Sequence, residues 1–150
     1  MDRIDINILK AMSENARITI SEVSSKVNLS VPAVAERVRR LEAGGVIQKY
    51  VSIINPEKMN KKLTAMVFVR TEEPGSNEGF SGFIARENDV LECYYIAGEF
   101  DYVLKINTSD TASLEKLLNK IKGIPGVIKT NTVITLSTIK LKYSNISEPE

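Results

Sequence analysis

Three short stretches at the start of the chain place apolar residues at helical spacing. The apolar stripes are Ile4, Ile8 and Met12; Ile20, Val23 and Val27; and Val34, Val38 and Leu41. Spacings of three and four residues put each set on one face of a helix. The pattern predicts three amphipathic helices that bury these faces against one another.

Start and stop signals sharpen the limits of these helices. Asp2 and Asp5 lie in the first turn of a helix over residues 2–14, where acidic side chains favour the helix dipole. The stretch Thr19-Ile20-Ser21-Glu22 matches a capping box, which predicts the second helix. Ser30 is the expected N-cap of the third helix and Pro32 lies in its first turn, while Gly44 is the expected left-handed residue at its end. Three helices with a three-residue link, Asn28-Leu29-Ser30, outline a helix-turn-helix.

The second part of the chain contains several segments with the composition of strands, separated by two helical segments. The β-branched and aromatic run Val46–Ile54 predicts a strand, and the polar stretch after Asn55-Pro56 predicts a hinge. The elements expected next are a strand over 63–71, a helix over 76–87, strands over 90–97 and 102–107, a helix that begins after Asp110, and a long strand over 127–142. Their order, βαββαβ, is that of a ferredoxin-like sandwich.

The predicted fold is therefore α+β, with a winged-helix-like helix-turn-helix module joined by a strand and hinge to a ferredoxin-like domain. The expected boundaries are a DNA-binding domain over 1–50, a linker over 51–62, an effector-binding and dimerisation domain over 63–143, and a tail over 144–150. The sheet should bury one face under its two helices. A second copy of the chain is the simplest cover for the other face.

Composition narrows the functional classes. The chain has 150 residues, of which 43% are hydrophobic and 26% charged, and it contains no histidine and one cysteine, Cys93. Without histidine there is no Ser-His-Asp arrangement, and one thiol builds neither a disulfide framework nor a thiolate metal site. Carboxylate or lysine chemistry stays open, but we expect no metal, no cofactor and no enzyme. The chain shows neither a membrane-length apolar run nor a secretory N-terminus, so the expected location is the cytoplasm.

The outward face of the third helix is the candidate DNA-binding surface. That face collects Pro32, Ala33, Glu36, Arg39 and Arg40, with Arg37 on its flank. Small residues first and arginines later suit entry into the major groove. We expect Val31, Pro32, Ala33 and Glu36, beside the N-cap Ser30, to face bases. Arg37, Arg39 and Arg40 should hold phosphates, with Ser21 and Arg17 near the DNA backbone.

Plainer interpretations stand beside this one. An Arg/Glu-rich face is commonly a solvated helix surface, and Arg37 can pair with Asp2 or Asp5 instead of DNA. Residues 1–55 carry 8 Lys and Arg against 6 Asp and Glu, so a single module has little net charge. Tethering two modules in a dimer raises the effective concentration of the second contact, which predicts a pseudo-palindromic site.

The motifs resemble those of one known family of prokaryotic regulators. The matching stretches are Leu29–Val34, Glu36–Val38, Arg40–Glu42, Gly45–Ile47 with Tyr50, Asp5 with Ile8-Leu9, Gly98–Tyr102, and Pro125–Val127 with Thr130 and Thr132. Together they resemble the Lrp/AsnC family, also called feast/famine regulatory proteins, over nearly the whole chain. The resemblance implies double-stranded DNA as a partner, a homodimer that in some members assembles into tetramers or octamers, and an amino acid or related metabolite bound between subunits.

The resemblance also implies where the effector binds. It points to the loop Gly98, Glu99, Phe100, Asp101 and Tyr102, and to Thr130 and Thr132 on the last strand. Gly98 can expose backbone N–H groups to a carboxylate, and Asp101 can pair with an ammonium group or organise the loop. A plain hairpin turn with a capping aspartate remains the alternative, as does simple β propensity for the two threonines.

Two other functions remain open from the sequence. One is a ferredoxin-like metabolite-sensing or oligomerisation module that binds no specific DNA. The other is a ferredoxin-like enzyme, against which the lack of histidine, of a metal cluster and of a phosphate loop weighs.

Overall fold

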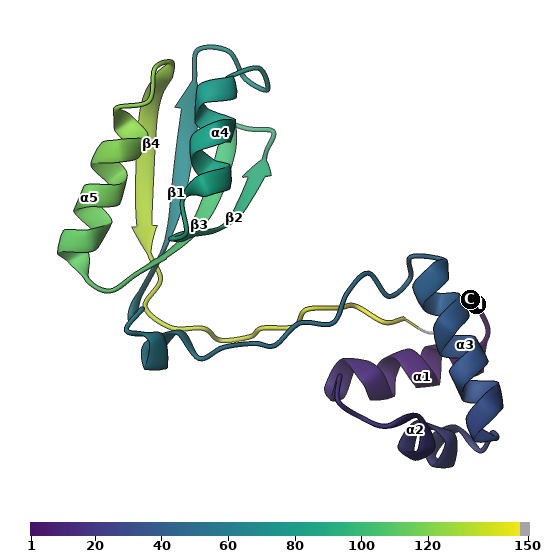
Figure 1. The fold of residues 1–150 in the computed structure, drawn as a ribbon. Helices are drawn as coiled ribbons and strands as arrows, with labels where there is room; N and C mark the ends of the chain where they lie inside the picture. Colours follow the sequence, from purple (N-terminus) through teal and green to yellow (C-terminus); the bar gives the residue numbers. More distant parts are fainter. Residues whose placement is uncertain (148–150) are drawn as a thin grey trace. The chain divides into compact units, whose positions relative to one another are not determined.

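The three apolar stripes at the N-terminus form three helices in the computed structural model, which describes residues 1–147. They are α1 (Arg3–Glu14), α2 (Ile20–Val27) and α3 (Val31–Ala43) (Figure 1). The buried centre of the module consists of Ile8, Val23, Val34, Val38 and Leu41. The remaining members of the stripes, Ile4, Met12, Ile20 and Val27, pack partly buried around it. Each predicted stripe therefore reaches the core.

The predicted start signals are present as hydrogen bonds. The predicted capping box of Thr19 and Glu22 is present on α2. Asp2 and Asp5, which the sequence predicts only as first-turn acids, form a reciprocal capping box on α1. The Ser30 hydroxyl accepts a hydrogen bond from the Ala33 N–H at 3.4 Å.

The predicted stop signal of α3 is displaced by one residue. Gly44 has a φ of −82°, and the left-handed residue is Gly45, with a φ of 71°. Gly44 still donates its N–H to the Arg40 carbonyl, as a helical residue does, and the chain turns afterwards, when the Val46 N–H bonds back to the Leu41 carbonyl at 2.9 Å. This is the Schellman arrangement, in which the residue after the cap takes the positive φ.

The second unit has the predicted βαββαβ order. Its elements are β1 (Leu63–Thr71), α4 (Glu78–Arg86), β2 (Val90–Tyr95), β3 (Tyr102–Thr108), α5 (Thr111–Lys122) and β4 (Val127–Ile134). The four strands form one antiparallel sheet in the order β2-β3-β1-β4. The α+β fold class is confirmed.

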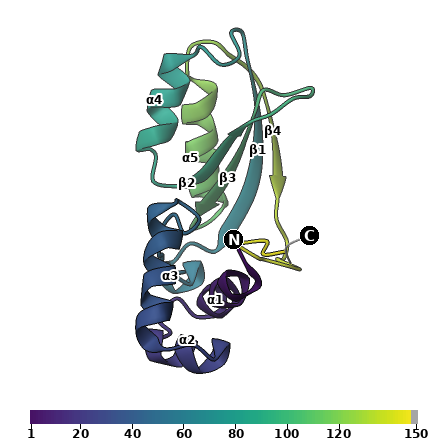
Figure 2. The same ribbon diagram turned by 90° about the vertical axis from the view of Figure 1, so that its right-hand side faces the viewer.

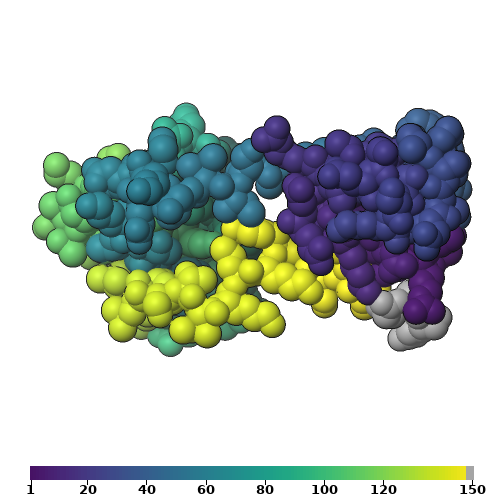
Figure 3. All heavy atoms as spheres, turned by 90° about the horizontal axis from the view of Figure 1, so that it is seen from below, coloured from purple at the N-terminus to yellow at the C-terminus, as the bar shows by residue number. Residues whose placement is uncertain are grey.

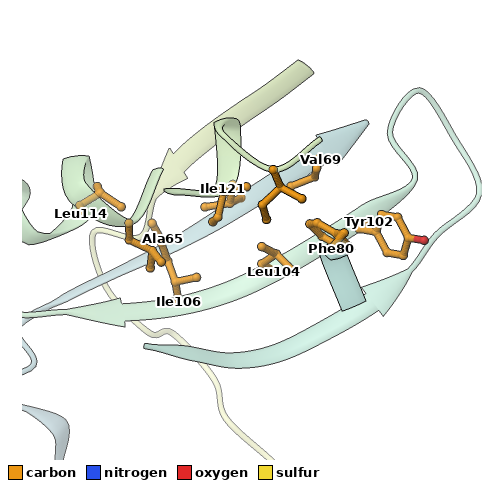
Figure 4. Packing of buried hydrophobic residues seen from close by; sticks show 11 residues of the cluster. Ala65, Val69, Phe80, Tyr102, Leu104, Ile106, Leu114 and Ile121 are labelled. Carbon is orange, nitrogen blue, oxygen red and sulfur yellow. The ribbon is translucent and has the colours of Figure 1, made fainter. Parts of the chain in front are cut away.

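The sheet buries one face under its helices. Figure 2 shows α4 and α5 together on one side of the sheet. Figure 4 shows side chains of that side, such as Val69, Leu104 and Ile106, meeting Phe80 of α4 and Ile121 of α5. Strand alternation sends the intervening residues to the opposite side, where no helix of this unit lies. We call this side the open sheet face; its apolar members include Met66, Phe68, Tyr94, Val103 and Val133.

Two predicted strand segments are wrong. Residues 46–54 form no strand in the described chain, and the last strand ends at Ile134 instead of Lys142. The β-branched composition of Val46–Ile54 is suitable, but a strand needs a hydrogen-bonding neighbour, and no strand of the described chain pairs with it. β4 ends because Ile134 already lies opposite Ala65, near the start of β1. Beyond it, the side chains of Leu136 and Ile139 are 97% and 93% exposed.

The predicted linker is partly structured. Residues Pro56–Met59 form the short 3-10 helix η1, capped by the Asn55 side chain. Lys61 then forms a salt bridge with Asp89, and the Asn107 side-chain amide donates to the carbonyls of Lys61 and Leu63. Residues 56–63 are therefore fixed to the ferredoxin-like unit.

The chain separates into two compact units. One contains Met1–Ile53 together with the segment from Lys140 onward, and the other contains Ile54–Ile139. The predicted tail over 144–150 belongs to that C-terminal segment, and its last residues, 148–150, lie outside the described residues. Figure 3 shows the C-terminal segment in yellow, with its side chains at the molecular surface.

Candidate DNA-binding surface and effector loop

The burial of one face of α3 determines which residues its outward face exposes. Val34, Val38 and Leu41 are held in the core of the helical module, so the residues half a turn away are exposed. The exposed positions of this helix include Val31, Pro32, Glu36, Arg39 and Arg40, while Ala33 is half-buried, and the N-cap Ser30 is exposed beside them. Small side chains occupy the first turn and arginines follow, as the sequence predicts.

A fixed turn places α3 after α2. Asn28 adopts the left-handed conformation with a φ of 53°. The buried Ser24 hydroxyl donates to the Leu29 carbonyl, and the Leu29 N–H donates to the Ser24 carbonyl at 3.2 Å. Sequence reasoning missed this role of Ser24, although asparagine in a three-residue link is a signal for positive φ. Ser21, which was expected near the DNA backbone, is exposed on the first turn of α2, and Arg17 is exposed just before that helix.

Arg37 is engaged within the module. Its Nη1 atom lies 2.8 Å from Asp2 Oδ2 and 2.7 Å from Asp5 Oδ1, so the alternative of an ion pair with the first helix is what the structure shows. The pKa of Asp2 is lowered, first by the Asp5 backbone N–H and then by the Arg37 guanidinium. Arg37 thus holds α3 against the start of α1, and the prediction that it mainly binds phosphate is not supported by its position.

Glu36 and Arg39 pair with each other on the outward face. Arg39 Nε and Nη2 donate to the two Glu36 carboxylate oxygens at 2.9 and 2.8 Å. The Arg39 guanidinium lowers the pKa of Glu36, and Glu36 raises the pKa of Arg39. The Arg40 side chain, by contrast, forms no hydrogen bond or salt bridge within residues 1–147. It is the arginine of α3 best placed to meet a phosphate.

Asp101 organises the loop between β2 and β3. Its Oδ2 atom accepts a hydrogen bond from the buried Thr71 N–H at 2.7 Å, its N–H donates to the Val69 carbonyl, and its carbonyl accepts from the Ile96 N–H. These bonds tie the end of β1 to the hairpin. Of the roles weighed for Asp101, loop organisation is the one for which the structure provides contacts.

Gly98 lies near the tip of this loop, where the space that a side chain would fill is open. Gly98 is exposed with a φ of 157°, and a Cβ atom at this position would meet nothing within 4 Å. Phe100 packs over Phe68 on the open sheet face, with ring centroids 5.8 Å apart. Glu99 pairs with Lys129 at 2.7 Å, and the same Lys129 nitrogen lies 5.3 Å from the Phe100 ring centroid.

The other predicted effector residues do not join this group within one chain. Tyr102 is only 7% exposed, packs on Phe80, and accepts a hydrogen bond from the Gly75 N–H through its hydroxyl (Figure 4). Its prediction as a ligand contact is not supported, because strand alternation places it in the core. Thr130 and Thr132 lie opposite Val69 and Val67. They therefore share the helix-covered side of the sheet, away from Phe100.

Two hollows of the described surface have linings without effector-loop residues. One of about 280 Å³ is lined by Glu72, Glu73, Ser76, Asn77, Glu78, Pro125 and Gly126. Another of about 190 Å³ is lined by Met1, Asp5, Arg37, Arg40, Leu41 and Val46. Neither is lined by a predicted effector residue.

Comparison with known proteins agrees with both units. Residues 1–48 match a family model described as a winged helix-turn-helix DNA-binding domain, and residues 64–144 match the Lrp/AsnC ligand binding domain. The leucine-responsive regulatory proteins of Salmonella typhimurium and Escherichia coli are each 35% identical over 143 residues, which cover 93% of this chain and 87% of theirs.

Solved structures extend the likeness to the whole fold. A transcriptional regulator of Neisseria meningitidis, in complex with L-methionine, matches with a TM-score of 0.92 at 29% identity, over 97% of this chain and 96% of that one. A feast or famine regulatory protein of Mycobacterium tuberculosis, also complexed with L-methionine, matches with a TM-score of 0.88 at 34% identity, over 97% and 99% of the chains.

A helix-turn-helix domain followed by a ligand-binding βαββαβ domain defines a ligand-responsive class of transcriptional regulator. Within that class, the chain belongs to the Lrp/AsnC family, as its motifs predict. Among its described residues, no helix combines the length and apolar character needed to cross a membrane.

The ion pair of Arg37 predicts a pH effect on stability. A carboxyl group whose pKa is lowered by folding stabilises the fold above its ordinary pKa, and this contribution is lost as the pH falls through the lowered value. Asp2, with an ordinary pKa of 3.8, is such a group. The Asp2→Asn variant keeps an N-cap side chain but removes the charge. We expect it to lose less thermal stability than the wild type between about pH 5 and about pH 2.

Thermal unfolding followed by circular dichroism at several pH values measures this effect. Glu14→Gln is the matched control, since Glu14 lies at the far end of the same helix and forms no ion pair within the described residues. Equal acid sensitivity of the wild type and Asp2→Asn would contradict the role given to Asp2.

The hydrogen bonds of Asp101 predict a stability difference between two substitutions. Asp101→Ala leaves the buried Thr71 N–H without its acceptor, which costs about 1–3 kcal/mol of unfolding free energy. Asp101→Asn keeps an acceptor oxygen at the same place, so its loss should be smaller. Urea unfolding of both variants measures the difference, and an equal loss would show that the acceptor is not what matters.

Proposed function

We propose that the chain binds pseudo-palindromic promoter DNA as a dimer through the outward face of α3, and that an amino acid modulates this binding at the loop around Gly98. The observation that carries the proposal is the capped, outward-facing α3 itself, with small residues before its exposed arginines. We propose further that the chain acts by binding and not by catalysis, in line with its regulatory relatives.

The geometry of α3 supports a division of labour on DNA. Val31, Pro32 and Ala33 allow close approach to base edges, where a thymine methyl suits small apolar groups. Arg40 is positioned for a phosphate. Arg37 keeps α3 attached to α1 and contributes to DNA binding by positioning the helix. Ser30 serves as the N-cap, and Ser21 is exposed near the start of α2.

The open sheet face supports the homodimer. Its apolar residues include Met66, Phe68 and Val103, which are only half-buried in one chain. They are flanked by two ion pairs, Lys105–Glu92 and Lys129–Glu99. A face on which half-buried apolar residues lie beside charges already paired with one another fits a second copy related by a two-fold axis. Tetramers and octamers of such dimers are the further assemblies that the family resemblance implies.

The effector proposal rests on the exposed tip of the β2–β3 loop. Gly98 presents its backbone without a side chain, and Asp101 holds the loop to β1. Two structural relatives are complexes with L-methionine, so an amino acid is the ligand class to test. Because Thr130 and Thr132 lie on the other side of the sheet, we assign the loop Gly98–Asp101 as the main contact and give the threonines a role only where subunits meet.

DNA binding is tested by its salt dependence. Fluorescence anisotropy with duplexes from the region upstream of the chain's own gene should show a specific complex whose affinity falls with salt. We expect Arg40→Gln to reduce the slope of log K against log salt by about 0.9 for each α3 engaged, since one phosphate contact is lost. Lys116→Gln, on the exposed side of α5, is the control for removal of one positive charge. Absence of any specific complex at low salt would favour a sensing or oligomerisation module instead.

The dimer is tested by a charge placed on the open sheet face. We expect Phe68→Lys to shift the chain from dimer to monomer, because the new ammonium group would be buried between two sheets. Sedimentation velocity measures the mass, and Lys116→Glu on the helix-covered side should leave it unchanged. A dimer that survives Phe68→Lys would place the interface elsewhere.

The effector is tested by a thermal-shift panel of the amino acids, led by L-methionine and L-leucine. A ligand that binds only the folded chain at a hundred times its Kd adds about 2.7 kcal/mol of stability. The amide of any amino acid that raises the melting temperature is the control, because it lacks the carboxylate that the Gly98 backbone would bind. If no amino acid raised the melting temperature, the proposal that an amino acid binds this chain would be wrong.

A further inference from the structure

Glu36 and Arg39 form an ion pair within α3 that joins no other element of the helical module. Both side chains lie on the outward face of α3, with 54% and 69% of their surfaces exposed. The two hydrogen bonds, at 2.9 and 2.8 Å, are bidentate and join residues three positions apart on one helix. Arg37, one position away, instead joins two helices. The Glu36–Arg39 pair therefore concerns the surface that α3 presents, not the packing of the module.

This pair changes what DNA meets on the surface. A phosphate that binds the Arg39 guanidinium must first displace the Glu36 carboxylate. The displaced carboxylate would then lie without a partner beside a polyanion, which is unfavourable. The cost of displacing the Glu36 carboxylate is smaller where the major groove offers it a hydrogen-bond donor. The N4 amino group of cytosine is the usual base partner of a carboxylate.

We propose that Glu36 is a specificity residue that withholds Arg39 from the phosphates of unrelated DNA and releases it where the groove presents an amino group. The proposal rests on the proposed DNA-binding function of α3. It assigns Glu36 two linked tasks, as a competitor for Arg39 in the free protein and as a base contact in the specific complex. A weakly charged module gains discrimination in this way, because fewer of its arginines are free for sequence-independent contacts.

The pair must be separated from the plain effect of a negative charge near DNA. Glu42 provides the comparison, since it is exposed on the same helix but accepts a hydrogen bond from the Tyr50 hydroxyl at 2.8 Å instead of pairing with an arginine. Removing the Glu42 charge changes the net charge of the module by the same amount and leaves Arg39 unaffected.

The experiment compares the full chain with Glu36→Gln, Arg39→Gln, the double variant and Glu42→Gln. Two duplexes of equal length serve as probes, one of unselected mixed sequence and one recovered by the wild type from a random pool. Dissociation constants are measured by fluorescence anisotropy over a series of KCl concentrations. Circular dichroism checks that each variant, altered only at exposed positions, keeps its helix content.

We expect Glu36→Gln to bind the mixed-sequence duplex about three- to tenfold more tightly at low salt, with a slope steeper by about 0.9 for each α3 engaged. Its affinity for the selected duplex should not rise, so the ratio between the two duplexes falls. In the Arg39→Gln background the same substitution should change affinity by less than about twofold, as should Glu42→Gln in the wild type.

Three results would overturn the proposal. The first is an equal gain from Glu36→Gln with and without Arg39, and the second is an equal gain from Glu42→Gln. Either of these would reduce the effect to net charge. The third is an equal gain on both duplexes, which would remove the link to specificity. Failure of the wild type to select or bind any duplex would be a different result, because it would overturn the proposed function itself.

Discussion

The surface that α3 presents depends on the burial of its apolar stripe. A module of three short helices has one small core, and Val34, Val38 and Leu41 must fill it together with Ile8 and Val23. Because helical geometry fixes where the other side chains point, this burial determines that Pro32, Glu36 and Arg39 face outward. The residues available to DNA are thus those that the core does not take up.

The same constraint explains why two of the three arginines of α3 are not free. Arg37 lies on the flank between the core and the outward face, within reach of the acidic first turn of α1. Arg39 lies one turn after Glu36, and the two side chains meet on the exposed surface. Arg40 forms no such bond within the part of the chain that the structure describes. The three arginines of this short helix thus have three different environments.

Local signals in the sequence predict most of the fold. The capping residues Thr19 and Asp110 are recognisable because each cap depends on near neighbours in the chain. The strand Leu63–Thr71 is recognisable from its apolar, β-branched composition, although its pairing partners lie far away in the chain. The run Val46–Ile54 has strand composition but no strand, since composition does not supply a partner. The length of β4 was likewise decided by a distant residue, the start of β1. Local sequence patterns do not show which distant segments pair as strands.

The candidate site follows the same rule. The outward face of α3 could be predicted from periodicity, but the partners of Arg37 could only be given as alternatives, because the ion pair spans more than thirty positions. Tyr102 adjoins the effector loop in sequence and yet lies in the core, with its hydroxyl bound to the Gly75 N–H. Thr130 and Thr132 match the family motif and still lie on the side of the sheet opposite Phe100. Proximity in a motif therefore does not establish a shared site.

The connection that leads from the helical module into the ferredoxin-like unit is anchored at both ends. The Tyr50 hydroxyl, whose pKa is raised to about 12 by burial and then by Glu42, donates to the Glu42 carboxylate of α3, and Asn55 caps η1. Only Val51, Ser52, Ile53 and Ile54 lie between these anchors, so fully extended chain between Tyr50 and Asn55 spans roughly 17 Å. In the proposed dimer, connections of this length would limit the spacing between the two half-sites. Inserting half a helical turn of DNA would rotate one half-site to the far side of the duplex. The four residues between Tyr50 and Asn55 would then determine which half-site spacing the dimer can bind.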